Sequence, residues 1–361
     1  MSAPHTKLFI PGPVEVSEKT LRAFATPMIG HRSSAFQELY AAIQPRLREL
    51  LFTKNPVFLS TSSAWGVMEG AIRNLVRPGR KLLCCMCGAF SDKWHEVALA
   101  CGISAEPLQV EWGQPILPEM VEARLAQGGF DAITFIHNET STGAMNPLTE
   151  VAGVMKRFPE TLLIVDSVSS LGGVRIEMDS LGLDVLLAGT QKALAMPPGL
   201  ALCAVSKRAL DRARQVPNRG YYFDLVEFVN NHEKNMTPST PSIGHIYALQ
   251  SRLEDIFTEG LDARYQRHLK MAQITRQWVR DRGFRMFPRE GYESLTLSCV
   301  ANQRKIDLAT WIKRLRERHH CIIDGGYGKI KGTTFRIAHM GDETPETITQ
   351  LLAWLDNTME R

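Results

Sequence analysis

The chain has 361 residues, of which 44% are hydrophobic and 22% charged, and its formal net charge is +4. This length exceeds one ordinary domain and predicts two, with enough residues for a large core. No apolar run approaches the ~20 residues that a membrane span needs, and the interleaved acidic and basic residues form no basic stripe. The sequence therefore argues against membrane and nucleic-acid binding.

The N-terminus and the cysteines indicate a cytoplasmic protein. The opening residues, MSAPHTKLFIPGP, lack the basic and apolar regions of a secretory signal. The seven cysteines are odd in number and lie mostly in apolar stretches, as is typical of reduced thiols. Cys85 and Cys87 are too closely spaced for the usual zinc-binding pair and have no second pair. We therefore expect no metal site and interpret their segment as a buried strand.

From about residue 56 to residue 205, short apolar runs alternate with amphipathic stretches, which is typical of a parallel sheet covered by helices. One of the predicted helices is Pro118–Ala126. The predicted strands are Val57–Ser60, Lys81–Cys87, Ala132–His137, Leu162–Asp166, Val185–Gly189 and Ala201–Val205.

The C-terminal part of the chain predicts a second, smaller α/β domain. A Pro- and Ser/Thr-rich passage, Met236–Ser242, is too short for a free linker and predicts an ordered loop. One long helical pattern then runs to Arg282, and strands and helices alternate again as far as Arg361. The expected fold class is α/β, with a mostly parallel sheet in the larger domain.

Two charged residues follow strands of the predicted sheet, where ligands of open parallel sheets bind. Asp166 ends one apolar strand, and Lys192 follows the strand that ends at Gly189. A desolvated lysine amine attacks an aldehyde, and a pyridinium nitrogen needs a carboxylate partner. Alone, Asp166 could be a helix cap and Lys192 a solvated side chain, but together they predict a site for a pyridoxal cofactor.

Two hydroxyl-rich turns also follow predicted strands. The turn at residues 60–66 precedes an amphipathic helix, whose free N–H groups and dipole would suit a phosphate. Ordinary N-capping by Ser62 or Ser63 is the alternative explanation of that turn. The hydroxyls of residues 137–143 could serve a cofactor phenolate or simply build a turn.

Seven strings in register resemble the class V aminotransferases, which are fold-type I pyridoxal-phosphate enzymes. The similarity runs from about residue 8 to 358 and is closest to the alanine- or serine-glyoxylate aminotransferase branch. The strings are PGP (11–13), GHRS (30–33), HNETSTG (137–143), VDSVSSLGG (165–173), QKAL (191–194), PPGL (197–200) and TPSTPS (237–242).

The resemblance implies pyridoxal 5'-phosphate as the cofactor and a division into two domains. Residues 15–245 would form the large cofactor-binding domain, and residues 1–14 and 246–361 the small domain. Lys192 would hold the cofactor as a Schiff base and move the proton between the substrate α-carbon and cofactor C4′. Asp166 would pair with the pyridine nitrogen.

The remaining cofactor contacts also come from the resemblance. Val168 would pack on one ring face and Phe90, where most close relatives have Trp, would stack on the other. Thr140 would bind the cofactor 3′ oxygen. An ordinary core position is the alternative for Phe90.

The resemblance places the phosphate at the turn before the helix that follows residue 63. A threonine of the other subunit completes this site in relatives, which implies a homodimer with shared active sites. Ala64 replaces a family glycine, and its backbone N–H could still donate if its φ stays negative. The expected phosphate contacts are Ser63, Ala64, Trp65, Gln191 and Thr240.

Arg336 is a single arginine in the apolar segment Thr334–Gly341, so its charge needs a partner. Its guanidinium group would bind the substrate α-carboxylate through two hydrogen bonds, and a structural salt bridge is the alternative. The family resemblance places Gly12 beside the same substrate. His31 and Arg32 could lie near the substrate side chain or support the dimer interface.

The expected reaction is ping-pong transfer of an amino group from alanine or serine to an oxo acid such as glyoxylate or pyruvate. A phosphoserine or aspartate aminotransferase remains open, since His31 and Arg32 could meet a substrate phosphate or second carboxylate. It would need a second anion-binding cluster, to which the lysines of residues 326–331 could contribute if they are not simply solvated. Cysteine desulfuration would need a mobile cysteine, for which Cys321 is the nearest candidate. A non-catalytic subunit that kept the fold is the alternative from another class.

Overall fold

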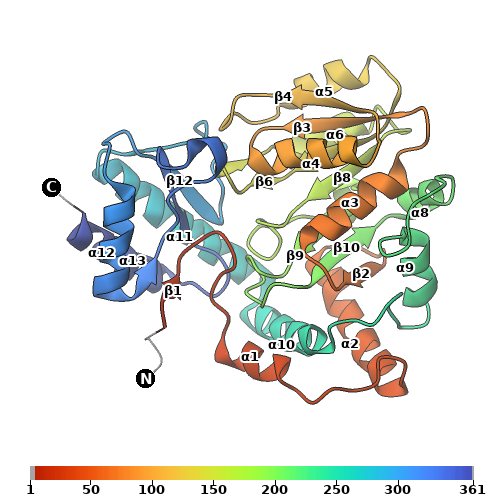
Figure 1. The fold of residues 1–361 in the computed structure, drawn as a ribbon, viewed down its shortest axis with the longest axis horizontal. Helices are drawn as coiled ribbons and strands as arrows, with labels where there is room; N and C mark the ends of the chain where they lie inside the picture. Colours follow the sequence, from red (N-terminus) through yellow and green to blue (C-terminus); the bar gives the residue numbers. More distant parts are fainter. Residues whose placement is uncertain (1–4, 360–361) are drawn as a thin grey trace.

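The computed structural model describes residues 5–359, which form a larger lobe and a smaller C-terminal lobe (Figure 1). The larger lobe contains a seven-stranded sheet of order β2-β10-β9-β8-β5-β3-β4. Neighbouring strands are parallel except at β10, which is antiparallel to both β2 and β9. The strands are β2 (Val57–Ser60), β3 (Lys81–Met86), β4 (Ala105–Gln109), β5 (Phe130–Ile136), β8 (Leu162–Asp166), β9 (Val185–Gly189) and β10 (Ala201–Val205).

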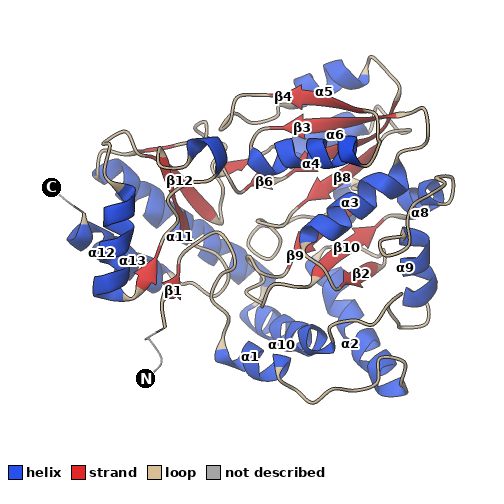
Figure 2. Ribbon diagram, viewed as in Figure 1, coloured by secondary structure: helices blue, strands red, loops and turns tan. Residues whose placement is uncertain are grey.

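Helices cover both faces of this sheet (Figure 2). Successive residues of β3 alternate between two cores: Leu82 and Cys84 pack into one, and Leu83 and Cys85 into the other. One face is covered by α2 (Ser34–Leu50), α5 (Pro118–Leu125), α6 (Leu148–Met155) and α10 (Ile243–Glu259), and the other by α3 (Ala64–Leu75), α4 (Ala89–Ala100), α8 (Lys207–Ala213) and α9 (Leu225–His232).

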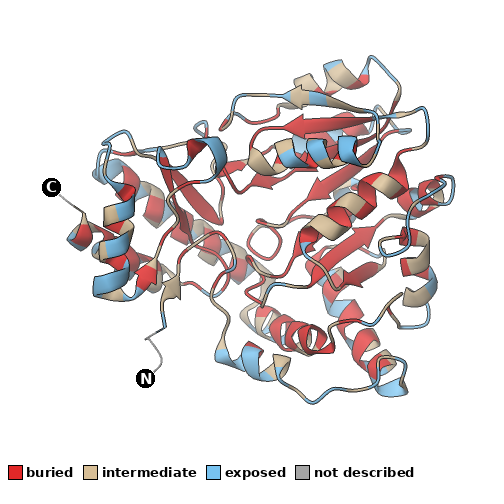
Figure 3. Cartoon of the chain, in the orientation of Figure 1, coloured by how far each residue is buried: buried red, intermediate tan, exposed pale blue. Residues whose placement is uncertain are grey.

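Burial on both faces explains why the strands are apolar throughout, and Figure 3 shows them buried at the centre of the lobe. Four of the six predicted strands have the predicted bounds. The predicted Lys81–Cys87 ends one residue earlier, and the predicted Ala132–His137 is Phe130–Ile136. The pattern missed edge strand β4, which is half-exposed and contains Pro107.

The smaller lobe is α/β, as predicted, and has its own core, which includes Trp311 and Phe335. Its antiparallel sheet has the order β11-β12-β14, and β1 pairs in parallel with β13. The division at residues 14 and 245 stays a prediction. The elements are β1 (Lys7–Leu8), β11 (Arg285–Met286), β12 (Leu297–Ala301), β13 (Cys321–Ile322), β14 (Thr334–Ala338), α11 (Leu261–Asp281), α12 (Leu308–His319), η1 (Gly328–Ile330) and α13 (Pro345–Thr358).

The single long helix predicted to reach Arg282 is wrong. The segment forms α10 and α11, separated by Gly260 at φ +86°. A residue at positive φ ends a helix, and glycine takes that conformation without strain. The break lets α10 pack in the larger lobe while α11 places Met271 and Trp278 in the smaller core. The predicted Pro118–Ala126 ends at Leu125. The short elements are α1 (Glu18–Phe24), β6 (Asn138–Glu139), β7 (Ala144–Met145) and α7 (Met178–Leu181).

The cysteines are free thiols, and all are buried except the half-buried Cys101. Cys85 lies in buried β3, which confirms the strand interpretation of its segment. Among residues 5–359 no group of His, Cys, Asp or Glu side chains could hold a metal ion. In the same part of the chain, no helix combines the length and the apolar character that crossing a membrane requires.

Candidate active site

Lys192, Asp166 and Thr140 lie where adjacent parallel strands end. Asp166 is the last residue of β8, Lys192 follows β9, and Thr140 follows β5 through the short strand β6. Because β9, β8 and β5 are neighbours in the sheet, these residues share one edge. The Lys192 Nζ lies 3.4 Å from the Thr140 Oγ1, to which it donates a hydrogen bond.

The Lys192 side chain is buried, with 8% of the residue exposed. Burial lowers the pKa of its amine to about 7, and the positive charge of Arg336 adds to this effect, while the charges of Asp166 and Glu139 oppose it. The solvated-lysine alternative is therefore wrong. At neutral pH a substantial fraction of this amine is uncharged, which is the nucleophilic form.

Asp166 is a buried carboxylate, and its Oδ1 accepts a hydrogen bond from the Val168 backbone N–H at 2.6 Å. No helix begins there, so a helix cap does not explain it. Burial, with a smaller contribution from the Glu139 charge, raises the pKa of this carboxyl to about 7, although the Val168 N–H and the Lys192 charge lower it. An added cationic N–H partner would favour the ionised form.

Phe90 lies in the first turn of α4 and is half-buried. Its ring centroid is 5.8 Å from the Lys192 Nζ, so it borders the same site. The fully buried Glu139 holds this helix start, because its carboxylate accepts the Ser91 N–H at 3.0 Å and the Ser141 hydroxyl at 2.6 Å. Half-buried Val168 follows Asp166 by two residues and packs at the edge of the same core as Phe90.

The N-terminus of α3 has unused donors. Ser63 is the N-cap residue, but its exposed hydroxyl makes no capping hydrogen bond, so N-capping does not explain Ser63. The hydroxyl of Ser62 instead makes a hydrogen bond with the hydroxyl of Ser60. Within residues 5–359 no acceptor is found for the N–H groups of Ala64 and Trp65. Ala64 is not among the residues at positive φ, as the expected N–H donation requires.

Gln191 lies beside this helix start. A Cβ built on Gly189 would be 2.6 Å from Gln191 Oε1 and 3.5 Å from the Ala64 Cβ. The structure thus brings Gln191 and Ala64 to one place, next to the Lys192 segment.

Arg336 points from β14 of the smaller lobe toward the same site. Its Nη1 donates to the Thr140 carbonyl at 2.9 Å, while its Nε and Nη2 both lie 2.8 Å from Asp324 Oδ1. The salt-bridge alternative is therefore part of the arrangement. A guanidinium has five N–H donors, so these contacts leave donors on both terminal nitrogens.

Gly12 lies against Lys192. It has φ +110°, and a Cβ built on it would be 2.9 Å from the Lys192 Cε. Any other residue at this position would push the lysine side chain aside.

Thr240 does not lie among these residues. It is exposed, and its hydroxyl is 3.5 Å from the Nε2 of half-buried His31. Arg32 beside it is exposed as well. The structure therefore brings the predicted residues together apart from Thr240, which lies on the surface together with His31 and Arg32.

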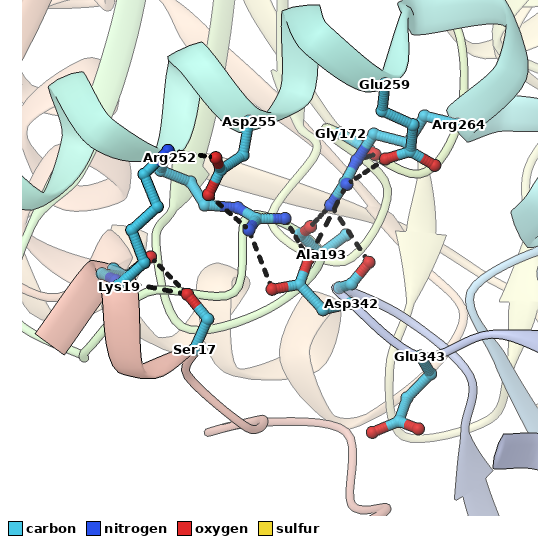
Figure 4. Close-up of polar contacts among 12 residues, drawn as sticks. Ser17, Lys19, Gly172, Ala193, Arg252, Asp255, Glu259, Arg264, Asp342 and Glu343 are labelled. Atoms are coloured by element: carbon cyan, nitrogen blue, oxygen red, sulfur yellow. Dashed lines mark hydrogen bonds and ion pairs between the residues drawn. The ribbon is translucent and has the colours of Figure 1, made fainter.

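Buried Arg264 of α11 joins the segments that carry the site (Figure 4). It donates to the carbonyls of Gly172 and Ala193 at 2.7 Å each and of Gly341 at 3.1 Å. Gly172 lies in the segment after Asp166, Ala193 follows Lys192, and Gly341 lies beyond β14. An ion pair with Glu259 at 2.8 Å balances its charge.

Sequence reasoning missed Glu139, Asp324 and Arg264. Glu139 stands among the hydroxyls of residues 137–143, and an acid three residues after the apolar strand β5 was an available signal. Asp324 is likewise the one acid after the apolar Cys321-Ile322-Ile323. Arg264 carries no local signal, because its acceptors are backbone carbonyls far away in the sequence.

Comparison with known proteins identifies the family. Residues 17–327 match the family model described as Aminotransferase class-V. An uncharacterized aminotransferase of Methanocaldococcus jannaschii is 36% identical over 337 residues, which cover 92% of this chain and 87% of that protein. The serine–glyoxylate aminotransferase of Arabidopsis thaliana is 30% identical over 342 residues, covering 93% and 85%.

Solved structures agree. The alanine–glyoxylate aminotransferase from Nostoc sp. superposes with a TM-score of 0.92 at 30% identity, covering 99% of this chain and 96% of that one. The chain therefore belongs to the class V aminotransferases, a family of pyridoxal-phosphate-dependent enzymes.

Proposed function

We propose that this aminotransferase moves the amino group of alanine or serine to an oxo acid such as glyoxylate or pyruvate, with its cofactor held covalently on Lys192. The observation that carries the proposal is the buried Lys192 amine, whose pKa is lowered to about 7, between a buried carboxylate and a positioned arginine. The relatives named for serine and alanine with glyoxylate support the choice of substrates.

The side chains present fit pyridoxal phosphate. Asp166 would pair with the ring nitrogen, Val168 and Phe90 would flank the ring, and Thr140 would meet the 3′ oxygen. The phosphate would take the unused donors of Ser63, Ala64 and Trp65 at the start of α3, with Gln191 beside them. When bound, this cofactor supplies an electron sink for the α-carbon and carries the amino group.

Lys192 would have two tasks. Its amine would hold the cofactor covalently between turnovers. When it is free, the same Nζ would accept the proton from the substrate α-carbon and later donate it back. A pKa near 7 suits both tasks at neutral pH, because the amine can accept and release a proton.

Arg336 would hold the substrate α-carboxylate through its remaining donors, while Asp324 and the Thr140 carbonyl fix its plane. This contact would orient the α-carbon toward Lys192. Gly12 would leave room for the lysine to move.

A homodimer with shared sites is part of the proposal. Thr240 is exposed in its own chain and is 3.5 Å from His31, so it is available to a second copy. Exposed Arg32 favours the alternative of an aspartate or phosphoserine donor, because an arginine on that surface could enter the partner's site and bind a second anion.

Two other functions that this fold could serve have less support. Cys321 is buried in β13 and its burial raises the pKa of the thiol to about 11, which does not suit a desulfurase nucleophile. A non-catalytic subunit would not need Lys192, Asp166 and Arg336 arranged together.

The test is a set of half-reactions with the cofactor-loaded protein. Five donors are added one at a time: alanine, serine, aspartate, glutamate and phosphoserine. The oxo acid that each releases is measured by mass spectrometry, and glyoxylate is then added as the acceptor. The proposal expects the oxo acid to appear with alanine or serine in the absence of any acceptor. Release only from aspartate or phosphoserine would favour the alternative, and no release from any donor would reject transamination.

A further inference from the structure

Tyr327 contacts two residues of the candidate active site from the smaller lobe. Its ring stacks on the Phe90 ring, with centroids 5.2 Å apart and an interplanar angle of 15°. The Arg336 guanidinium lies 5.4 Å from the centroid of the same ring. One aromatic side chain, 45% exposed, therefore touches both the ring-flanking residue and the arginine proposed to hold the carboxylate.

The loop that carries Tyr327 is held in place on both sides. Asp324 and Arg336 exchange two backbone hydrogen bonds, of 3.1 and 2.7 Å, at its base. Gly326 and Gly328 flank the tyrosine at positive φ, and a Cβ on Gly328 would be 2.9 Å from the Trp112 ring. The position of the Tyr327 ring is thus set by its loop and by the stacking partners.

A cavity of about 570 Å³ borders the Phe90–Tyr327 pair. Neither Lys192 nor Arg336 lines it. Its lining combines the aromatic rings of Trp65, Phe90, Trp112 and Tyr327 with the charged side chains of Glu69, Asp92, Lys93 and Glu96. Tyr327 lines this cavity and also contacts Arg336, so its ring is part of the wall between the cavity and the carboxylate-binding arginine.

We infer that Tyr327 determines donor size: it restricts the amino donor to a small side chain by closing the active site toward this cavity. The inference rests on the proposed function, in which Arg336 holds the donor carboxylate. A donor bound there has its side chain within reach of the Tyr327 ring, where a methyl or hydroxymethyl group fits and an aromatic group collides. Removal of the ring would open the site to a hollow lined by three remaining aromatic residues, which suits an aromatic donor.

The test compares Tyr327→Ala with Tyr327→Phe, which keeps the ring and serves as the matched control. Calorimetry measures binding of propionate and 3-phenylpropionate, carboxylic acids without an amine, to each cofactor-loaded protein. The same proteins are then assayed with alanine and phenylalanine for kcat/KM. Because the residue lies on the surface of a loop, equal melting temperatures are expected and are checked.

We expect Tyr327→Ala to raise the affinity for 3-phenylpropionate relative to propionate at least ~10-fold. The kcat/KM for phenylalanine relative to alanine should rise in parallel. The reason is that a buried phenyl group contributes more than the 1.4 kcal/mol that a factor of ten represents. Tyr327→Phe should keep the wild-type ratio. An unchanged ratio in Tyr327→Ala, or no binding of propionate to the wild type, would overturn the inference. A shifted binding ratio in a protein that transaminates no donor would instead reject the proposed function and keep the size restriction.

Discussion

At the scale of single residues, the environment of Lys192 leads to a pH prediction. Its pKa lies near 7, whereas a solvated lysine has a pKa near 10.4. The amine is protonated and unreactive below its pKa, so the rate at which apo-protein captures pyridoxal phosphate should rise with pH through about 7 and then level off. Stopped-flow absorbance at a series of pH values measures this rate.

Arg336→Gln provides the control for that prediction. The Arg336 charge helps to lower the pKa of Lys192, so its removal should move the midpoint of the capture rate to higher pH. A midpoint above about pH 9 in the wild type, or no movement in the variant, would contradict this account of the lysine.

Arg336 itself leads to a second prediction. Arg336→Lys keeps the charge but loses the fork, so KM for the amino donor should rise ~10- to 100-fold while kcat changes less. Steady-state kinetics with the best donor measure the split. Asp324→Asn should give a smaller rise, because the aspartate orients the guanidinium and would not itself contact the donor carboxylate. Equal kinetic constants for Arg336→Lys and wild type would show that the arginine serves the salt bridge with Asp324 alone.

Local sequence signals accounted for part of the site at this scale. Asp166 and Lys192 could be singled out because each follows an apolar strand. Phe90 and Gly12 came only from the family resemblance, since a phenylalanine after a strand and a glycine before a proline have many ordinary explanations. Asp324 was missed because its role depends on pairing with Arg336, which the sequence places 12 residues away without fixing the register.

At the scale of elements, Arg264 of α11 should stabilise the junction of the two lobes. Arg264→Met removes the donors to the carbonyls of Gly172, Ala193 and Gly341 and leaves Glu259 without this partner. Glu259 keeps its ion pair with Arg267 at 2.6 Å, so the main cost comes from the buried carbonyls left without this donor. Such a loss costs ~1–3 kcal/mol, and the free energy of unfolding should fall by about that amount. Urea unfolding followed by tryptophan fluorescence measures it.

Arg22→Met is the matched control, because Arg22 pairs with Glu18 on the exposed surface of α1 and its loss should leave the unfolding midpoint unchanged. If Arg264→Met unfolds at the wild-type urea concentration, the network does not hold the lobes together.

The elements also show where sequence patterns succeed. β2, β8, β9 and β10 were predicted to the residue because strands buried on both faces read as continuous apolar runs. β4 was not predicted, because an edge strand pairs with only one neighbouring strand and therefore tolerates Glu106 and Pro107. The break at Gly260 was hidden because α10 and α11 follow each other directly with similar helical patterns.

At the scale of the whole molecule, we expect a homodimer with two shared sites. Sedimentation should give twice 40.4 kDa. Thr240→Ala should weaken cofactor retention without changing that mass, and mixing it with Lys192→Ala should restore one intact site per mixed dimer. Full cofactor affinity in a monomer, or no effect of Thr240→Ala, would place the phosphate site within one chain. Thr240 and the homodimer are expected from the family resemblance alone, because Thr240 is exposed in its own chain and carries no local signal for a phosphate site.

Covalent attachment of the cofactor to Lys192 can be measured by trapping it chemically. The purified protein is loaded with pyridoxal phosphate, reduced with borohydride, digested and analysed by mass spectrometry, with Lys192→Ala treated in parallel. We expect a yellow protein that loses its colour on reduction, with the cofactor then fixed on the peptide that contains Lys192, and no fixed cofactor in the variant. Labelling of another lysine in the wild type, or no labelling at all, would contradict it.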